Sequence, residues 1–261
     1  MSVPVRDEYV DFCEGIRRLT QIDLLQYKRG QMERRIRSFA DRRGIKGLSD
    51  YLKALQASGE ELDEFLDRVT INVSQLWRNP EQWRFLEKDI IPELAKTGKV
   101  RCWSAGSSYG AEAYTLAATC VETAPNARVE VLGTDIDKRV VERARRGRFS
   151  AEDARTAPQD KLKRWFVEDD GVWEAKPELK RAVRFETGDL LRNTFPKEAY
   201  DLVLCRNVVI YFTEPVRDEL HARLAASVRP GGYLMIGSTE RVSSPRDLGL
   251  EPSHPFTYRK R

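Results

Sequence analysis

The chain of 261 residues contains few of the side chains that bind metals or form disulfides. Its two histidines, His221 and His254, are too few for a common zinc site, and its four cysteines share no C-x-x-C spacing. Cys102 and Cys205 fall inside expected buried strands. We therefore expect no bound metal, and we expect reduced core thiols of the kind found in cytoplasmic proteins.

Long apolar runs are also missing. No stretch approaches the ~18 residues of a membrane span, and residues 1–9 lack the apolar core of a secretion signal. We therefore expect a cytoplasmic protein that does not insert into a membrane. Charged residues make up 33% of the chain and hydrophobic residues 41%, an ordinary balance for a soluble protein with one large domain or two smaller ones.

The stretch Val100 to Ala118 contains the most informative pattern. A short strand is expected up to Trp103, Gly106 and Gly110 then interrupt it, and a helix is expected from Ala111. Strand, glycine-rich turn and helix begin a βαβ unit, in which a ligand approaches bare backbone amides at the helix N-terminus.

The next expected strand, residues 129–133, leads to Asp135, 29 residues after Gly106. A carboxylate at the end of that strand can accept hydrogen bonds from both ribose hydroxyls of a nucleoside. The glycine-rich turn together with Asp135 predicts a nucleoside cofactor. The plainer interpretation, a turn that only packs a helix on a sheet, stays open at this point.

The turn has the form G-x-x-x-G rather than the G-x-G-x-x-G of dinucleotide enzymes. Glu112 follows it in the first helical turn, where its carboxylate would repel a pyrophosphate but suit the ammonium of a methionine group. The pattern favours S-adenosylmethionine over a nicotinamide dinucleotide.

Residues 1 to about 70 show helical patterning only. Between Arg17 and Lys46 ten basic residues stand against three acidic ones. On the expected helix over residues 28–43, apolar side chains form one face and arginines the other, with Arg34 and Arg37 projecting and Arg35 and Arg42 flanking. The stripe is either a solvated face or a surface for an acidic partner, which could be nucleic acid or an acidic helical protein. Because no aromatic residues are interleaved, single-stranded nucleic acid is disfavoured.

Residues 71–95 link the two halves. Asn79-Pro80 predicts a helix start with Asn79 as the N-cap. Upstream, Asn72, Ser74 and Arg78 are polar groups that either lie near the cofactor turn or only cap the backbone. Further on, an aromatic hairpin at about residues 160–185 is expected as an excursion from the main sheet.

Two later strands end in polar residues. Residues 183–186 lead to Asp189, and the continuous apolar run 202–205 leads to Asn207. Ligands of open α/β sheets bind beyond the carboxyl ends of the strands, so we expect both residues at the same crevice as Gly106 and Asp135.

These pieces are similar to a known family. The matching strings are Leu19–Lys28 with Glu33–Ile36, Thr70–Ser74 with Trp77–Glu81, Trp103–Gly106 through Glu112–Tyr114, Gly133–Asp137, Leu204–Phe212 and Pro230–Gly237. They cover nearly the whole chain, and the string Cys-Arg-Asn-Val-x-Ile-Tyr-Phe is the most specific. The chain resembles the chemotaxis receptor methyltransferases of the CheR type.

The resemblance implies an α/β fold: a Rossmann-like class I S-adenosylmethionine-dependent methyltransferase domain (residues 96–261) with an inserted small β-subdomain, preceded by a small all-α N-terminal domain (residues 1–70). It implies methylation of glutamate side chains on the acidic helical cytoplasmic domain of chemoreceptors, with S-adenosylhomocysteine as the product. Nucleic acid is not an expected partner.

The resemblance also implies roles for single residues. Arg78 and Tyr211 would lie nearest the reacting methyl, and Arg34, Arg35 and Arg37 would meet the receptor. The implied cofactor-binding residues are Asn72, Ser74, Arg78, Gly106, Glu112, Asp135, Asp189, Leu190, Asn207 and Val208.

The chain departs from the family pattern at four positions. Ala111 and Ala113 stand where a second Glu and a Pro are usual, Ser238 replaces a His, and Tyr109 is large enough to narrow the pocket. Two other functions therefore stay open: methyl transfer to RNA or a small molecule, and cofactor binding without catalysis. A substrate carboxylate is already ionised at neutral pH and needs no general base. Catalysis would then consist of positioning by Arg78 and Tyr211.

Overall fold

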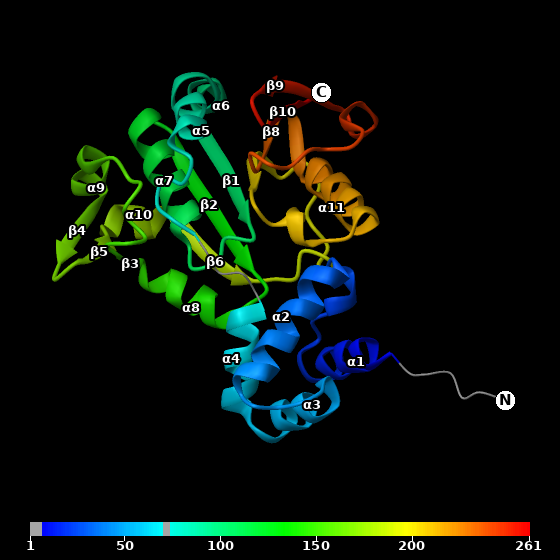
Figure 1. Ribbon diagram of the computed structural model, residues 1–261. Coiled ribbons are helices and arrows are strands. Elements are labelled where there is room, and N and C mark those ends of the chain that lie inside the picture. The colour runs from blue at the N-terminus through cyan, green and yellow to red at the C-terminus, as the bar shows by residue number, and fades with distance from the viewer. Residues whose placement is uncertain (1–6, 70–73) are drawn as a thin grey trace. The chain divides into compact units, whose positions relative to one another are not determined.

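The computed structural model describes residues 7–69 and 74–261 (Figure 1). The chain divides into two compact units, residues 1–71 with 211–216, and residues 72–210 with 217–261. We call their described parts the helical unit and the sheet unit.

The helical unit packs amphipathic helices around aromatic side chains. The ring of Phe12 stacks on Tyr51 at 5.8 Å and meets Phe65 edge-on at the same distance. Apolar residues at helical spacing in the second helix, Met32 and Ile36 among them, are buried as the sequence predicts. The helices are α1 (Glu8–Thr20), η1 (Leu24–Gln26), α2 (Arg29–Arg42), α3 (Leu48–Ala57) and α4 (Gly59–Val69).

A short segment from late in the chain belongs to this unit. The main-chain N–H of Lys28 donates to the carbonyl of Tyr211 at 2.8 Å, and the rings of Tyr27 and Phe212 lie 4.9 Å apart. The segment that carries Tyr211 is therefore anchored on the helical unit.

The sheet unit contains a seven-stranded sheet in the order β6-β2-β1-β7-β8-β10-β9. The first five strands of this order are parallel, and β10 and β9 add an antiparallel edge. β7 is buried along its whole length, as the apolar run predicts for a central strand covered on both faces. The strands are β1 (Lys99–Ala105), β2 (Arg128–Asp135), β6 (Val183–Thr187), β7 (Tyr200–Cys205), β8 (Val228–Ile236), β9 (Leu250–His254) and β10 (Thr257–Lys260).

Helices connect β1 to β2, β2 to β6 and β7 to β8, as is usual for β-α-β crossovers, whereas residues 188–199 join β6 to β7 without a helix (Figure 1). Among the described helices, none combines the length and apolar character that crossing a membrane requires. The helices are α5 (Pro80–Phe85), η2 (Leu86–Ile90), α6 (Ile91–Leu94), η3 (Ala95–Thr97), α7 (Ala111–Thr123), α8 (Lys138–Arg146), α9 (Gln159–Trp165), α10 (Pro177–Ala182), η4 (Val209–Tyr211), α11 (Glu214–Ser227) and η5 (Pro245–Leu248).

A second, three-stranded antiparallel sheet is inserted between β2 and β6. It has the order β3-β5-β4, with β3 (Arg148–Ser150), β4 (Phe166–Asp169) and β5 (Val172–Ala175). Asp170 and Gly171 both have positive φ, which suits the tight turn between β4 and β5. Phe149 of β3 packs edge-on against Tyr114 at 5.6 Å and so joins this small sheet to the main core.

Candidate cofactor site

The strand order of the main sheet reverses at β1, which lies between β2 and β7. Three segments that contain expected site residues follow the carboxyl ends of these strands, namely the turn after Ala105, Asp135 itself and the loop after Cys205. Open α/β sheets bind ligands at such a reversal.

The turn after β1 is held by the protein itself. The N–H groups of Gly106 and Ser107 both donate to the carbonyl of Thr134, at 2.9 and 2.8 Å. The amide of Ser108 donates to Asp135, and that of Gly110 to Ser107. The expectation that the turn offers bare amides to a ligand is therefore wrong at these four positions.

Glycine at position 106 is required by its surroundings. Its φ is +76°, and a Cβ there would lie 2.5 Å from Val208 Cγ2. The structure therefore brings Gly106 and Val208, from opposite halves of the sheet unit, into contact.

Asp135 accepts hydrogen bonds from the amides of Ser108 and Asp137 at 2.8 and 3.1 Å. Burial nevertheless raises the pKa of its carboxyl to about 6, and the amides oppose that shift only in part. The N–H of Gly188 donates to the Asp135 carbonyl at 2.8 Å, which places Asp189 and buried Leu190 beside it.

Glu112, in the first turn of α7, is tied down by two donors. Its Oε1 accepts from the Ser104 hydroxyl at 2.7 Å, and its Oε2 accepts from Arg206 Nη1 at 3.2 Å. The Arg206 side chain is only 2% exposed. The carboxylate expected to receive a ligand ammonium thus already neutralises a buried guanidinium.

Arg78 lies in a strained turn before α5. Trp77 and Asn79, on either side of it, have φ of 51° and 57°. The Arg78 carbonyl accepts from Trp83 Nε1 at 2.9 Å and from Arg206 Nη2 at 3.0 Å. Asn79 stands at the N-cap position, but its side chain makes no cap hydrogen bond and instead accepts from Arg206 at 3.2 Å.

Tyr109 is committed to contacts within the protein. Its hydroxyl donates to Asp153 at 2.8 Å and also contacts the Ser74 carbonyl, and the Arg143 guanidinium covers its ring at 3.9 Å. Ser74 in turn donates its amide to the Tyr109 hydroxyl at 3.2 Å. The large side chain thus anchors the segment before Arg78 to the turn. Asn72 lies outside the described residues.

The Glu240 carboxylate contacts the backbone of the loop after β7. It also accepts from the Gly237 amide at 2.6 Å. Burial raises the pKa of this carboxyl, and the amides of Asn207 and Val208 oppose that shift only in part. Asn207 has a positive φ of 60°.

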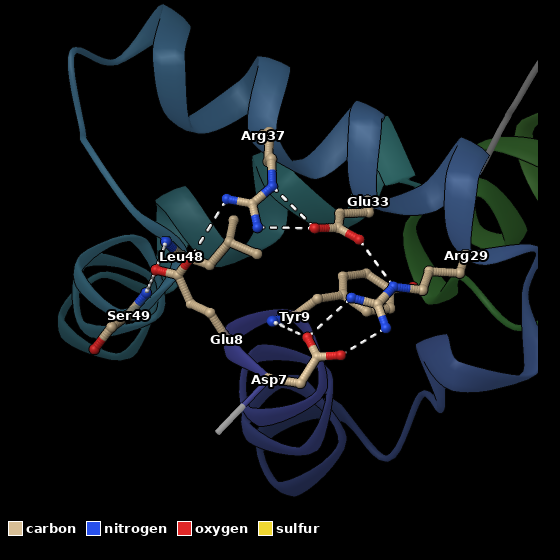
Figure 2. Close-up of polar contacts among 8 residues, drawn as sticks. All are labelled: Asp7, Glu8, Tyr9, Arg29, Glu33, Arg37, Leu48 and Ser49. Atoms are coloured by element: carbon tan, nitrogen blue, oxygen red, sulfur yellow. Dashed lines mark hydrogen bonds and ion pairs between the residues drawn. The ribbon is translucent and has the colours of Figure 1, made fainter. Parts of the chain in front are cut away.

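The remaining expected residues lie in the helical unit. Figure 2 shows Arg37 on α2 donating to Glu33 at 2.8 Å and to Glu8 at 3.3 Å, while Arg29 pairs with Asp7 and Glu33. Of the three arginines expected to meet a substrate, Arg37 is thus neutralised.

The other two differ in what holds them. Arg35 donates to the Val69 carbonyl at 3.1 Å. Arg34 is exposed, and its side chain has no partner among the described residues. Tyr211, half-buried, belongs to the segment anchored on this unit.

Comparison with known proteins settles the family. The model of the CheR methyltransferase SAM-binding domain matches residues 72–254, and that of the CheR all-alpha domain matches residues 7–70. The chain belongs to the CheR methyltransferase family. Among curated relatives, the chemotaxis protein methyltransferase of Listeria innocua is 35% identical over all of both chains. That of Borreliella burgdorferi is 31% identical over 92% of this chain and 89% of its own.

The chain is therefore a methyltransferase of chemotaxis that uses S-adenosylmethionine, and its fold is the expected class I methyltransferase domain preceded in the sequence by an all-α domain. The residues present fit this cofactor. Asp135 is a half-buried acceptor without a cation partner in the described chain, and the Ser107 hydroxyl is buried with no partner there. Among these described residues, no group of three or more His, Cys, Asp or Glu could hold a metal ion.

Sequence reasoning assigned no role to Arg206 or Glu240. A signal existed for Arg206, because a charged residue directly after the continuous apolar run 202–205 is buried with it and must find partners. No sequence signal identifies those partners, which come from two separate segments, residues 78–79 and Glu112.

Proposed function

We propose that the protein forms methyl esters on glutamate side chains of the helical cytoplasmic domain of chemoreceptors. The observation that carries the proposal is the exposed edge of α2 at Arg34. An open groove follows that edge, lined by Gly30, Glu33, Arg34, Arg37, Ser38 and Asp41. Acidic partners neutralise Arg29 and Arg37. The charge that remains on α2 for an acidic helix therefore lies on Arg34, Arg35 and Arg42.

In this proposal residues 1–70 are the receptor-facing domain, residues 71–95 connect it, and residues 96–261 hold the cofactor and include the small sheet at about 160–185. Asp135 accepts from the ribose, Glu112 from the methionine ammonium, and Gly106, Asp189, Leu190, Asn207 and Val208 line the adenosine. The list of cofactor residues is completed by Asn72, Ser74 and Arg78.

S-Adenosylmethionine, when bound, supplies an electrophilic sulfonium methyl. The protein then needs to hold an ionised glutamate carboxylate in line with it, and no proton has to be removed. Arg78 suits this task because its guanidinium can hold a carboxylate and its backbone is fixed by Trp83 and Arg206. Tyr211 is the second positioning group, through its hydroxyl.

The test is methyl transfer from labelled S-adenosylmethionine to a chemoreceptor cytoplasmic fragment. Base-labile label on glutamate, lost in Arg78→Ala, supports the proposal. Label on RNA or a small molecule instead identifies a different acceptor. Tight cofactor binding with no transfer to any acceptor identifies a binding protein and contradicts it.

A further inference from the structure

Arg206 is the first residue after β7 and one of the most deeply buried charges described. Burial opposes its charge and lowers the pKa of its guanidinium, while Glu112 raises it. Burying an arginine is costly unless its N–H groups find acceptors. Here both Nη atoms find them, while Nε has no partner in the described chain.

Those acceptors come from two places that the proposed function treats separately. Nη1 donates to Glu112 Oε2 at 3.2 Å. Nη2 donates to the Arg78 carbonyl at 3.0 Å and to Asn79 Oδ1 at 3.2 Å. The guanidinium carbon also lies 5.4 Å from the centre of the Trp83 ring.

We propose that Arg206 is a positioning residue that joins the ammonium-binding carboxylate of Glu112 to the turn that presents Arg78. One arm of its planar fork orients the carboxylate, and the other locks Asn79 and the Arg78 carbonyl. This inference rests on the proposed function, because it takes from it the roles of Glu112 and Arg78.

The fork shape matters because lysine carries the same charge as a single ammonium on a flexible stem. Arg206→Lys therefore keeps a cation in the pocket but cannot serve both sets of acceptors in their present geometry. This variant therefore distinguishes a role of Arg206 in positioning both groups from a role in neutralising Glu112 alone.

The experiment is calorimetric titration of the full chain with two ligands. S-Adenosylhomocysteine carries the amino-acid group, and 5′-methylthioadenosine lacks it. We expect Arg206→Lys and Glu112→Gln to weaken the first about 10- to 100-fold, as for loss of a charged hydrogen bond, and the second less than about threefold. The double variant should lose little more than the worse single variant, because both act on one contact.

Arg259→Lys is the matched control, an exposed arginine paired with Glu93 at 2.6 Å, and it should leave both affinities unchanged. Turnover gives a second reading: Arg206→Lys should lower kcat at saturating cofactor, because the Arg78 turn is released, whereas Glu112→Gln should mainly raise KM for the cofactor.

Three results would overturn the inference. Equal weakening of both ligands by Arg206→Lys would reduce Arg206 to a general structural role. Full retention of affinity and kcat in Arg206→Lys, with Glu112→Gln impaired, would remove its positioning role alone. No effect of Glu112→Gln on S-adenosylhomocysteine would instead refute the site assignment in the proposed function.

Discussion

The two units use the same chemical pair in opposite settings. In the helical unit Arg37 and Glu33 lie 2.8 Å apart, with side chains 43% and 23% exposed. In the sheet unit Arg206 and Glu112 lie 3.2 Å apart, with 2% and 12% exposed. The shorter pair is the weaker contributor to stability, because water screens it and each partner can be solvated alone. The longer pair cannot be divided without stranding a charge.

Because of this difference in burial, the two units tolerate substitution of a charged residue to different degrees. Exposed pairs such as Arg29–Asp7 and Arg37–Glu8 join α1 to α2 and can be exchanged at small cost. The buried pair carries three further hydrogen bonds, to Ser104, the Arg78 carbonyl and Asn79, so a change at either partner reaches the whole cofactor site.

The largest expected effect comes from dividing the buried pair. Glu112→Ala leaves the Arg206 guanidinium without its counter-charge and should cost about 3–5 kcal/mol of unfolding free energy in the sheet unit. All five tryptophans lie in that unit, so urea unfolding followed by tryptophan fluorescence reports on it. Glu112→Gln also removes the counter-charge but keeps an oxygen acceptor for Arg206, so the difference between the two variants measures the hydrogen bond. A loss below about 1 kcal/mol in Glu112→Ala would show that the pair behaves like a surface pair.

The same contrast explains what sequence could and could not predict. The glycine turn, Asp135 and the buried strand β7 follow from local patterns, because strand period and turn chemistry act between near neighbours. The charge on α2 is visible in the sequence as an excess of arginine, and the pairing of Arg29 and Arg37 with Glu33 follows from i,i+4 spacing. Their neutralisation by Asp7 and Glu8 depends instead on how α1 packs on α2.

The buried network shows the limit more sharply. Asn79 has the sequence of an N-cap, yet Arg206, 127 residues away, takes its side chain. Tyr109 looked large enough to narrow the cofactor pocket, yet Ser74 and Asp153 hold its hydroxyl. Such contacts are tertiary, and no local pattern encodes them.

A buried group without any partner sharpens the comparison further. His221 on α11 is 1% exposed, its ring nitrogens have no hydrogen-bond partner in the described chain, and burial lowers its pKa to about 4. The unfolded chain binds a proton at this histidine below about pH 6.5, whereas the folded chain binds it only near pH 4. The folded state therefore has its full stability above pH 6.5 and loses it progressively as the pH falls through 4. By pH 5 the loss of unfolding free energy amounts to roughly 2 kcal/mol. His221→Leu should unfold with a flatter pH dependence between pH 7 and 5, and an unchanged slope would contradict the assignment.

Asp135 is an intermediate case, a half-buried carboxylate that accepts from the amides of Ser108 and Asp137. Its raised pKa of about 6 means that half the cofactor-free protein carries a neutral Asp135 at that pH. A neutral acid is a poorer acceptor for ribose hydroxyls, so affinity for S-adenosylhomocysteine should be full above pH 7 and fall about tenfold by pH 5. Asp135→Asn should bind weakly with little pH dependence. If wild type and variant lose affinity in parallel, another group titrates.

The smallest effects are expected from substitutions on α2. There Arg37 should matter for stability and Arg34 for receptor binding. Arg37→Ala removes exposed pairs with Glu33 and Glu8 and should cost under about 1 kcal/mol of stability. Arg34→Ala removes no contact within the described chain, so it should leave stability and cofactor affinity unchanged. It should raise KM for the receptor fragment several-fold at low salt and less at high salt, because the contact it removes is a screened charge. Arg18→Ala, 69% exposed on α1, is the matched control. If it raised KM as much as Arg34→Ala, the receptor would be sensing overall charge, and the exposed edge of α2 would have no specific role.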